Sequence, residues 1–155
     1  MKFLKKVFHI IFATSDKRVS YYVNMLAWLK NKNMRPIGLI LSRRLQRKYG
    51  VFLPYNAGFD SSLILRHPTS VIVGEGVELG KNVILFQNVT LGRSDTNVPA
   101  YPSIGDNTII YAGAVVLGDI KIGNNCIVAA NAVVIKDIPD NSIAVGVPAR
   151  VLSKS

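Results

Sequence analysis

The sequence has very little cysteine or histidine, and this scarcity limits the kinds of site it can build. Cys126 is the single cysteine, so the chain cannot form an internal disulfide, which agrees with a reducing compartment. The two histidines, His9 and His67, cannot supply the several histidine ligands of a catalytic zinc site. We therefore expect no metal.

Long hydrophobic runs are also missing. Apolar residues make up 49% of the chain, yet no run approaches the roughly 20 residues that cross a bilayer. The most apolar segment, VFHIIFA at 7–13, is too short to span and lacks the pattern of a cleaved signal peptide. His9 lies within it, and we expect a packing or surface role. We expect a cytoplasmic protein, and association with a membrane surface is the alternative.

Acidic residues are scarce in one part of the chain. Residues 1–50 contain twelve Lys and Arg residues against the single acid Asp16, whereas residues 51–155 contain seven against eight. The first part carries a net charge of +11 and the rest −1, which together give +10. This asymmetry indicates an anionic partner, either a membrane surface or a charged glycan. No nucleic-acid motif occurs, so nucleic acid is not expected; a solvated helical face is the alternative.

Residues 1–50 are predicted to form a basic helical segment. In SDKRVSYYVNMLAWLKNKN, residues 15–33, Ser15 and Asp16 are candidate N-caps. The apolar positions of this stretch have helical spacing: Val19, Val23, Leu26 and Leu29. In RPIGLILSRRLQRKYG, residues 35–50, Pro36 suits the first turn and Gly50 the C-terminal stop. The apolar stripe expected there consists of Ile37, Ile40, Leu41 and Leu45.

After Gly50 a period of six replaces the helical period. The aliphatic positions are Val73, Leu79, Leu85 and Leu91, then Ile104, Ile110, Val116, Ile122, Val128 and Val134. Three such hexads complete an 18-residue coil of a parallel β-helix, in which Ile104 stacks on Ile122. Small residues beside these positions, such as Gly74 and Gly80, are expected to allow the tight corners. A β-sandwich is disfavoured because it would show a period of two with variable turns.

Two irregularities interrupt the period. Leu53, Phe59 and Leu65 keep the same step but are offset by two extra residues, which we assign to Val71 and Ile72. The frame also breaks at 93–103, RSDTNVPAYPS. We therefore expect a β-helix domain at 51–152 with a loop at 93–103, and loops on rigid scaffolds often carry specificity.

The hexads, the segment LRHPTSVIVG and the ending GVPARVL resemble the hexapeptide-repeat acyltransferases. Within that group the chain is most similar to the serine acetyltransferase-like branch, including O-acetyltransferases of polysaccharide gene clusters. The resemblance covers about residues 21–152. It implies a left-handed β-helix, a homotrimer or a dimer of trimers with active sites between subunits, and acetyl-CoA as the donor substrate.

The resemblance also implies that His67 is the general base. A neutral imidazole can take the proton of an acceptor hydroxyl near neutral pH, and backbone N–H groups can stabilise the developing oxyanion. Two residues before His67, Leu65 is expected to pack inward, so the histidine projects from the coil. The alternative is a surface or interface histidine without a catalytic role.

The chain departs from the serine acetyltransferase pattern around this histidine. Arg66 stands where that branch has an Asp that helps to hold the amino acid, and an Arg would repel an ammonium group. Phe52 replaces a second family Asp that orients the base, which leaves Asp60 as the nearest upstream candidate. Tyr101 is nearest to a loop histidine of that branch. We therefore expect a sugar or glycan hydroxyl as acceptor, with Arg66, Asp60, Arg93, Asp95 and Tyr101 as candidate acceptor contacts.

Donor contacts follow from the same resemblance, which places CoA along a groove lined by small residues. The matching positions are Ala112, Gly113 and Ala130, while Lys136 and Arg150 could meet the CoA phosphates. Corner packing is the alternative for the small residues, and solvated charge is the alternative for Lys136 and Arg150.

Four other functions compete with sugar O-acetylation. A serine O-acetyltransferase of cysteine biosynthesis would use the same fold and the same base. A non-enzymatic trimeric scaffold would need no His67 at this position. A β-helical carbonic anhydrase would need several histidines, and a sugar nucleotidyltransferase would need a large α/β domain that residues 1–50 cannot provide.

Overall fold

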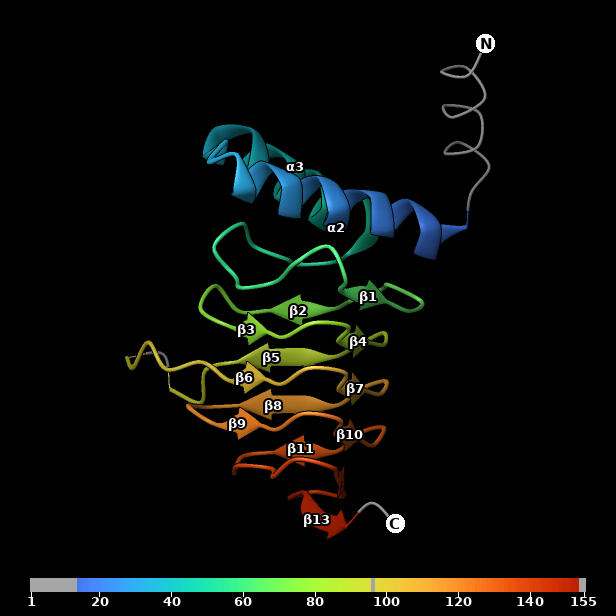
Figure 1. Ribbon diagram of the computed structural model, residues 1–155, viewed down its shortest axis with the longest axis vertical. Helices are drawn as coiled ribbons and strands as arrows, with labels where there is room; N and C mark the ends of the chain where they lie inside the picture. Colours follow the sequence, from blue (N-terminus) through green and yellow to red (C-terminus); the bar gives the residue numbers. More distant parts are fainter. Residues whose placement is uncertain (1–13, 96, 154–155) are drawn as a thin grey trace.

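The structure is a computed structural model that describes residues 14–95 and 97–153. Two helices cross one end of a long coil of short parallel strands (Figure 1). His9 lies outside the described residues. Within the described part no helix is long and apolar enough to cross a membrane.

The coil is built from three sheets along its sides, which are parallel except for the antiparallel pair of β12 and β13 at the carboxyl-terminal end, and this confirms the predicted β-helix. One sheet orders β1-β4-β7-β10-β12-β13, another β11-β8-β5-β2 and the third β3-β6-β9. The strands on the first half of the coil are β1 (Ile64–Leu65), β2 (Ile72–Val73), β3 (Glu78–Leu79), β4 (Ile84–Leu85), β5 (Thr90–Gly92) and β6 (Ser103–Ile104). Those on the second half are β7 (Ile109–Ile110), β8 (Val115–Leu117), β9 (Lys121–Ile122), β10 (Ile127–Val128), β11 (Val133–Val134), β12 (Ser142–Val145) and β13 (Arg150–Ser153).

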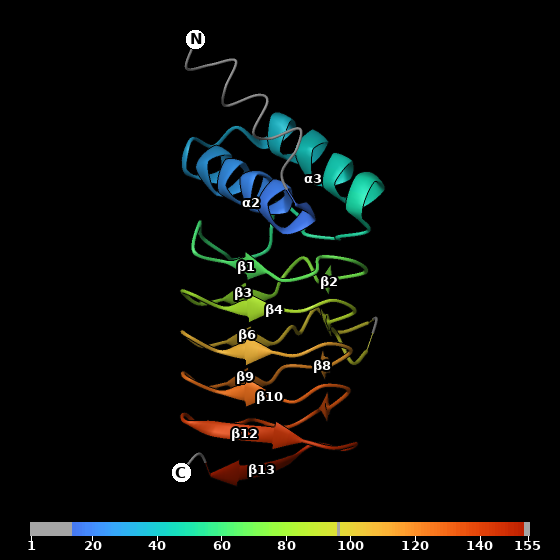
Figure 2. The same cartoon turned by 90° about the vertical axis from the view of Figure 1, so that its right-hand side faces the viewer.

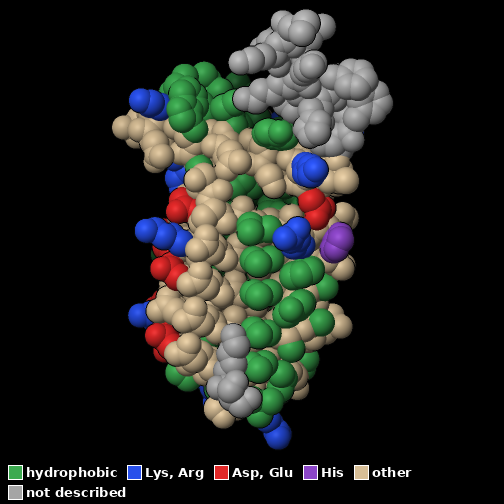
Figure 3. All heavy atoms as spheres, turned by 45° about the vertical axis from the view of Figure 1, so that its right-hand side comes forward, with side chains coloured by type: hydrophobic (Ala, Val, Ile, Leu, Met, Phe, Trp, Pro, Cys, Tyr) green, Lys and Arg blue, Asp and Glu red, His purple; other side chains and the backbone are tan. Residues whose placement is uncertain are grey.

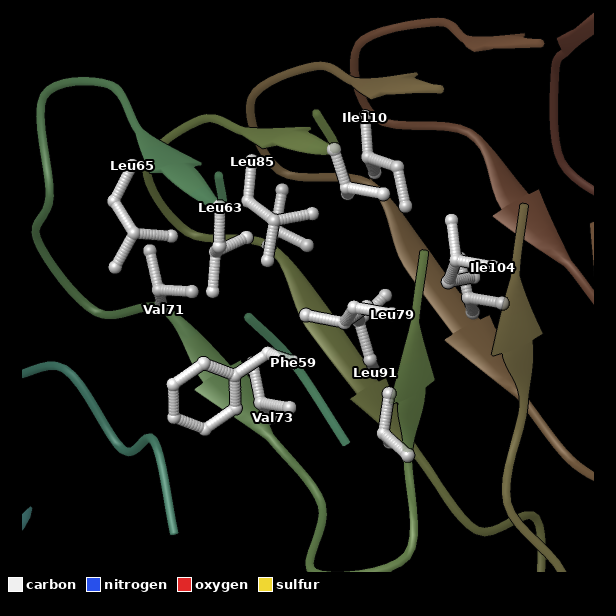
Figure 4. Close-up of a cluster of buried hydrophobic side chains, with 14 of the residues drawn as sticks. Phe59, Leu63, Leu65, Val71, Val73, Leu79, Leu85, Leu91, Ile104 and Ile110 are labelled. Carbon is white, nitrogen blue, oxygen red and sulfur yellow. The ribbon is translucent and has the colours of Figure 1, made fainter. Parts of the chain in front are cut away.

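The aliphatic residues of the hexads form the core of the coil. The predicted stacks are observed: Ile104 pairs with Ile122, and Val116 with Val134. These side chains are at most 3% exposed, and Figure 4 shows the upper stacks pointing into the coil interior. Because each coil is too thin to bury its own apolar side, this stacking supplies the hydrophobic stabilisation.

The corners use asparagine and glycine for different purposes. Six corner residues with left-handed backbone are asparagines: Asn82, Asn88, Asn107, Asn125, Asn131 and Asn141. Asparagine tolerates this conformation better than most residues. Glycines after the aliphatic positions instead permit close approach, since a Cβ at Gly105 would lie 2.6 Å from the carbonyl carbon of Gly123. The expectation that small residues make the corners is therefore only partly right.

The helices α2 (Ser15–Asn31) and α3 (Arg35–Tyr49) close the amino-terminal end (Figure 2). Val19, Val23 and Leu26 of α2 are buried as predicted. The N-cap of α2 is Thr14, not Ser15 or Asp16, and it makes no side-chain cap bond. Gly50 ends α3 in the left-handed conformation, as expected.

The apolar stripe of α3 does not all face the core. Leu45 is fully buried, and Leu41 packs against the core from its edge. Ile37 and Ile40, however, are exposed. The reason is the packing of Gly38, where a Cβ would lie 2.2 Å from the Tyr55 ring, so that this side of α3 lies against the first coil.

Candidate active site

His67 lies in the corner that joins β1 to β2, and this corner is longer than its counterparts. Leu65 pairs with Leu85, twenty positions later, whereas Val73 pairs with Leu91, eighteen positions later. Val71 and Ile72, to which we assigned the excess, are in regular register, because Ile72 pairs with Thr90. The assignment of the two extra residues is therefore wrong.

Backbone hydrogen bonds identify the extra residues as His67 and Pro68. The Arg66 N–H donates to the Leu85 carbonyl at 2.8 Å, as the Phe86 N–H donates to the Ile110 carbonyl one coil further on. The Thr69 carbonyl accepts from the Asn88 N–H at 2.9 Å. In the next coil the corresponding acceptor is Gln87, which follows Phe86 directly. Residues on both sides of His67 and Pro68 thus keep the hydrogen-bond pattern of the coil, and the two inserted residues are His67 and Pro68.

This insertion presents the imidazole to solvent. Pro68 is buried while His67 is exposed. His67 has φ of 48°, a left-handed conformation that costs free energy for a residue with a side chain and that is often found at functional sites. The ring lies 6.3 Å from the Phe86 ring, centroid to centroid, and Phe86 stacks on Tyr111 at 4.9 Å.

Phe86 and Tyr111 form the wall beneath the imidazole, and sequence reasoning did not select them. A signal was present, because Phe86 breaks the rule that a small residue follows the aliphatic position. A linear pattern shows that break but not that Phe86 lies directly below the His67 corner.

The small residues among the donor candidates share one corner column with His67. Ala112 and Gly113 form the corner between β7 and β8, and Ala130 lies in the corner between β10 and β11. The Gly113 N–H donates to the Gln87 carbonyl at 3.0 Å, and the Asn131 N–H donates to the Ala112 carbonyl at 2.9 Å. The column therefore runs without interruption from His67 along the coil.

Gly113 also has a packing role. Its φ is 72°, and a Cβ there would lie 2.2 Å from Oδ1 of Asn131. Arg150 begins β13 immediately after Ala149, whose N–H donates to Val133 at the end of the same column. Lys136 does not lie in this column. It follows the other end of β11, where the chain continues toward Ile138.

Asp60 does not orient His67 within the chain. Its carboxylate accepts from the Ser62 N–H at 2.7 Å and from the Ser62 hydroxyl at 2.5 Å. The Ser62 hydroxyl bond, followed by the backbone bond, lowers the pKa of Asp60 below its usual value. Among the described residues the His67 imidazole has no hydrogen-bond partner, and Arg66 beside it is exposed.

The loop between β5 and β6 lies on a different edge of the coil from the corner between β1 and β2 (Figure 1). Tyr101 covers Gly74 and Gly76, where a Cβ would lie 2.6 and 2.4 Å from its ring. The Arg93 guanidinium lies 5.4 Å from the Tyr101 ring centroid, and Asp95 accepts from the Asn97 N–H at 2.8 Å. A single chain therefore does not bring the loop residues to His67.

The outer side of the His67 sheet is apolar along its length. One residue per strand points outward and is half-buried: Ile64, Ile84, Ile109, Ile127 and Ile143. Figure 3 shows columns of hydrophobic side chains along this side of the coil, next to the histidine. No group of three or more potential metal ligands is found among the residues that the structure describes.

The sequence comparisons with known proteins all match transferases. Residues 101–136 match the family described as bacterial transferase hexapeptide (six repeats). The chain is 36% identical over 129 residues to the serine acetyltransferase of Mycobacterium tuberculosis, covering 83% of this chain and 56% of that protein. It is 38% identical over 136 residues to probable serine acetyltransferase 5 of Oryza sativa, covering 87% of this chain and 39% of the relative.

Solved structures agree with the sequence relatives. The serine acetyltransferase of Brucella abortus in complex with coenzyme A superposes with a TM-score of 0.83 at 28% identity, covering 96% of this chain and 60% of that chain. The soybean enzyme complexed with serine gives 0.79 at 33% identity, covering 93% and 60%. The expected left-handed β-helix is confirmed. The chain spans about two-fifths to three-fifths of the length of these relatives.

The comparisons contradict the expected sugar acceptor. The relatives and structures found are serine acetyltransferases, and none is a polysaccharide O-acetyltransferase among those reported above. Arg66 and the basic first fifty residues were therefore the wrong basis for choosing the acceptor. The charge of one side chain beside His67 does not by itself identify the acceptor.

Proposed function

Because residues 101–136 match the bacterial transferase hexapeptide family, we propose that the chain is an O-acetyltransferase that moves the acetyl group of acetyl-CoA to the hydroxyl of serine. The observation that carries this proposal is the His67 corner. An insertion of His67 and Pro68 exposes an imidazole at the head of a column that contains Ala112 and Ala130. Short side chains there leave room for an extended donor substrate beside the base.

In the proposed reaction the His67 imidazole accepts the proton of the serine hydroxyl as the hydroxyl oxygen bonds to the thioester carbonyl carbon. The carbon–sulfur bond then breaks, and the imidazolium returns the proton to the leaving thiolate. The products are O-acetylserine and CoA with a free thiol, so atoms and charge balance. Phe86 below the imidazole limits the directions from which an acceptor can approach.

Arg66 has a different role in this proposal from the one expected. Its exposed guanidinium lies next to the base in sequence, and guanidinium groups pair well with carboxylates. The carboxylate of serine supplies that partner, while the Arg66 charge alone gives no reason to prefer a sugar.

We propose that the enzyme acts as a homotrimer. The outward isoleucines, for example Ile109 and Ile127, give the apolar side that a second copy would cover. Loop residues Arg93 and Tyr101 lie on another edge of the same chain. Packing of copies around an axis parallel to the coil would bring that edge of one protomer toward His67 of the next.

The test follows thiol release from acetyl-CoA with L-serine as acceptor. We expect His67→Ala to lower kcat by about 10²- to 10⁴-fold, with the same oligomer size as the unmodified protein. Lys121→Ala, an exposed cation on β9, is the matched control and should retain activity.

Two results would overturn the proposal. One is the absence of L-serine-dependent thiol release in the unmodified protein. The other is release that His67→Ala leaves unchanged. A non-enzymatic scaffold would in addition show no thermal stabilisation by acetyl-CoA, whereas a donor site must raise the unfolding temperature.

A further inference from the structure

The outward side of α2 carries large apolar side chains. Lys30 marks the side that faces the coil, since its ammonium group donates to the Ala57 carbonyl and lies 4.7 Å from the Phe59 ring centroid. With about 3.6 residues per turn, Tyr21, Met25 and Trp28 lie on the opposite side of the helix. They are 40%, 50% and 51% exposed.

The outward side of α3 has the same character. Ser42 and Gln46 mark the side that faces the coil, because they line a cavity there together with Phe52 and Tyr55. The opposite side presents Ile37 and Ile40, which are 49% and 64% exposed.

Basic side chains accompany these apolar ones. Lys32 at the end of α2 and Arg44 on α3 are exposed on the same outward sides. We call the following set the end surface: Tyr21, Met25, Trp28, Lys32, Ile37, Ile40 and Arg44. It lies at the end of the molecule away from the coil, as Figures 1 and 2 show for the two helices.

The positive charge of the end surface distinguishes between its possible binding partners. Residues 14–50 contain nine Lys and Arg residues and one acid, Asp16. A second copy of the same surface would bring two strongly positive faces together, which is unfavourable. Nucleic acid would match the charge but not the exposed Met25, Ile37 and Ile40. An anionic lipid bilayer matches both, because aromatic and basic side chains favour its interface while aliphatic side chains enter the acyl boundary.

We propose that the end surface docks this protein on an anionic lipid bilayer. The helices lie on the bilayer, with Met25, Trp28 and Ile40 at headgroup depth and Lys32 and Arg44 against lipid phosphates. The coil then extends away from the bilayer, and the His67 corner stays accessible to soluble substrates. This inference does not depend on the reaction proposed above.

The full chain offers its own probe, because Trp28 is the single tryptophan. Vesicles of phosphatidylcholine are compared with vesicles that also contain phosphatidylglycerol, using co-sedimentation and tryptophan fluorescence. We expect binding to the anionic vesicles at least about tenfold tighter than to neutral ones, with a blue shift of Trp28 emission. High salt should weaken the binding by screening the charges.

Variants separate this surface from general positive charge. Lys32→Glu with Arg44→Glu should weaken anionic-vesicle binding at least about tenfold, by removing two cations and adding two anions at the bilayer. Lys121→Glu with Lys136→Glu makes the same charge change on the coil, where both side chains are exposed, and should have little effect. Circular dichroism establishes that both double variants fold. Ile37→Ser with Ile40→Ser is an independent variant that removes apolar insertion and leaves the charge intact.

Several outcomes would overturn the inference. They are equal binding to neutral and anionic vesicles, binding without a Trp28 blue shift, and equal loss in the end-surface and coil variants. A change of oligomeric size in the end-surface variants, without vesicle binding by the unmodified chain, would identify a second copy as the occupant. Retention on nucleic acid without vesicle binding would identify nucleic acid.

Discussion

Replacing Gly105 by alanine tests the close spacing of the coils. Gly105 follows the buried Ile104, and a Cβ built on it would lie 2.6 Å from both the carbonyl carbon and the oxygen of Gly123 and 2.7 Å from the Asn124 nitrogen. All three atoms belong to the backbone of the next coil, so no side chain can rotate out of the way. Gly105 does not have positive φ, and the clash is therefore the main effect of the substitution.

Gly92 is the matched control. It also follows a buried aliphatic residue, Leu91, but a Cβ there would meet only the Leu117 side chain at 3.8 Å. Gly105→Ala must push neighbouring coils apart, and overpacking of this kind costs about 1–3 kcal/mol. Gly92→Ala restricts the unfolded chain without a clash and should stabilise by about 0.4–1 kcal/mol.

Urea unfolding followed by far-ultraviolet circular dichroism measures the difference. The midpoint for Gly105→Ala should fall below that of the unmodified protein, and the midpoint for Gly92→Ala should equal or exceed it, with similar slopes. Equal midpoints for the two variants would refute the reasoning. It would mean that the coils adjust their spacing at little cost and that glycine at these positions has another cause.

Two other predictions concern polar groups. The hydroxyl of buried Thr108 donates to the Gly123 carbonyl at 2.9 Å and accepts from the Cys126 N–H at 3.1 Å. Thr108→Val should destabilise the protein by about 1–3 kcal/mol, because both backbone groups stay buried without a hydrogen bond. An unchanged urea midpoint would contradict this prediction. The pKa of Asp60 lies below its ordinary value of 3.8, chiefly because of the Ser62 hydroxyl. The associated stability is present above pH 3.8 and is lost as the pH falls through the lowered pKa. Ser62→Ala should raise that pKa in an NMR titration, and an unmoved titration would show that the hydroxyl bond is unimportant.

The sequence predicted most of the coil because repetition makes the pattern redundant. An error at one hexad leaves the others in step, so Ile104 over Ile122 and Val116 over Val134 followed from spacing alone. The role of the corner asparagines could have been found in the same way, since GKN, GDN and GNN recur at 80–82, 105–107 and 123–125.

Positions without such redundancy were harder to predict. The six-residue repeat is shifted by two residues between Leu65 and Val73, which indicates an insertion there. The repeat alone does not indicate which residues are inserted. The hydrogen bonds of Arg66 and Thr69 to the next coil decide that point. Likewise, apolar residues at helical spacing do not indicate which of them face the coil. In the structure Gly38 packs against the Tyr55 ring, and Ile37 is exposed.

By itself the sequence determined the repeat, the stacked aliphatic core and the two basic helices, because each depends on spacing or composition along the chain. Only the tertiary structure decided that His67 is itself the inserted residue, that Phe86 lies beneath it and that Ala112 continues the same column. It also separated Tyr101 from that column. Which side chains of successive coils become neighbours depends on the register between those coils. Two residues inserted at one corner change that register and therefore change the neighbours.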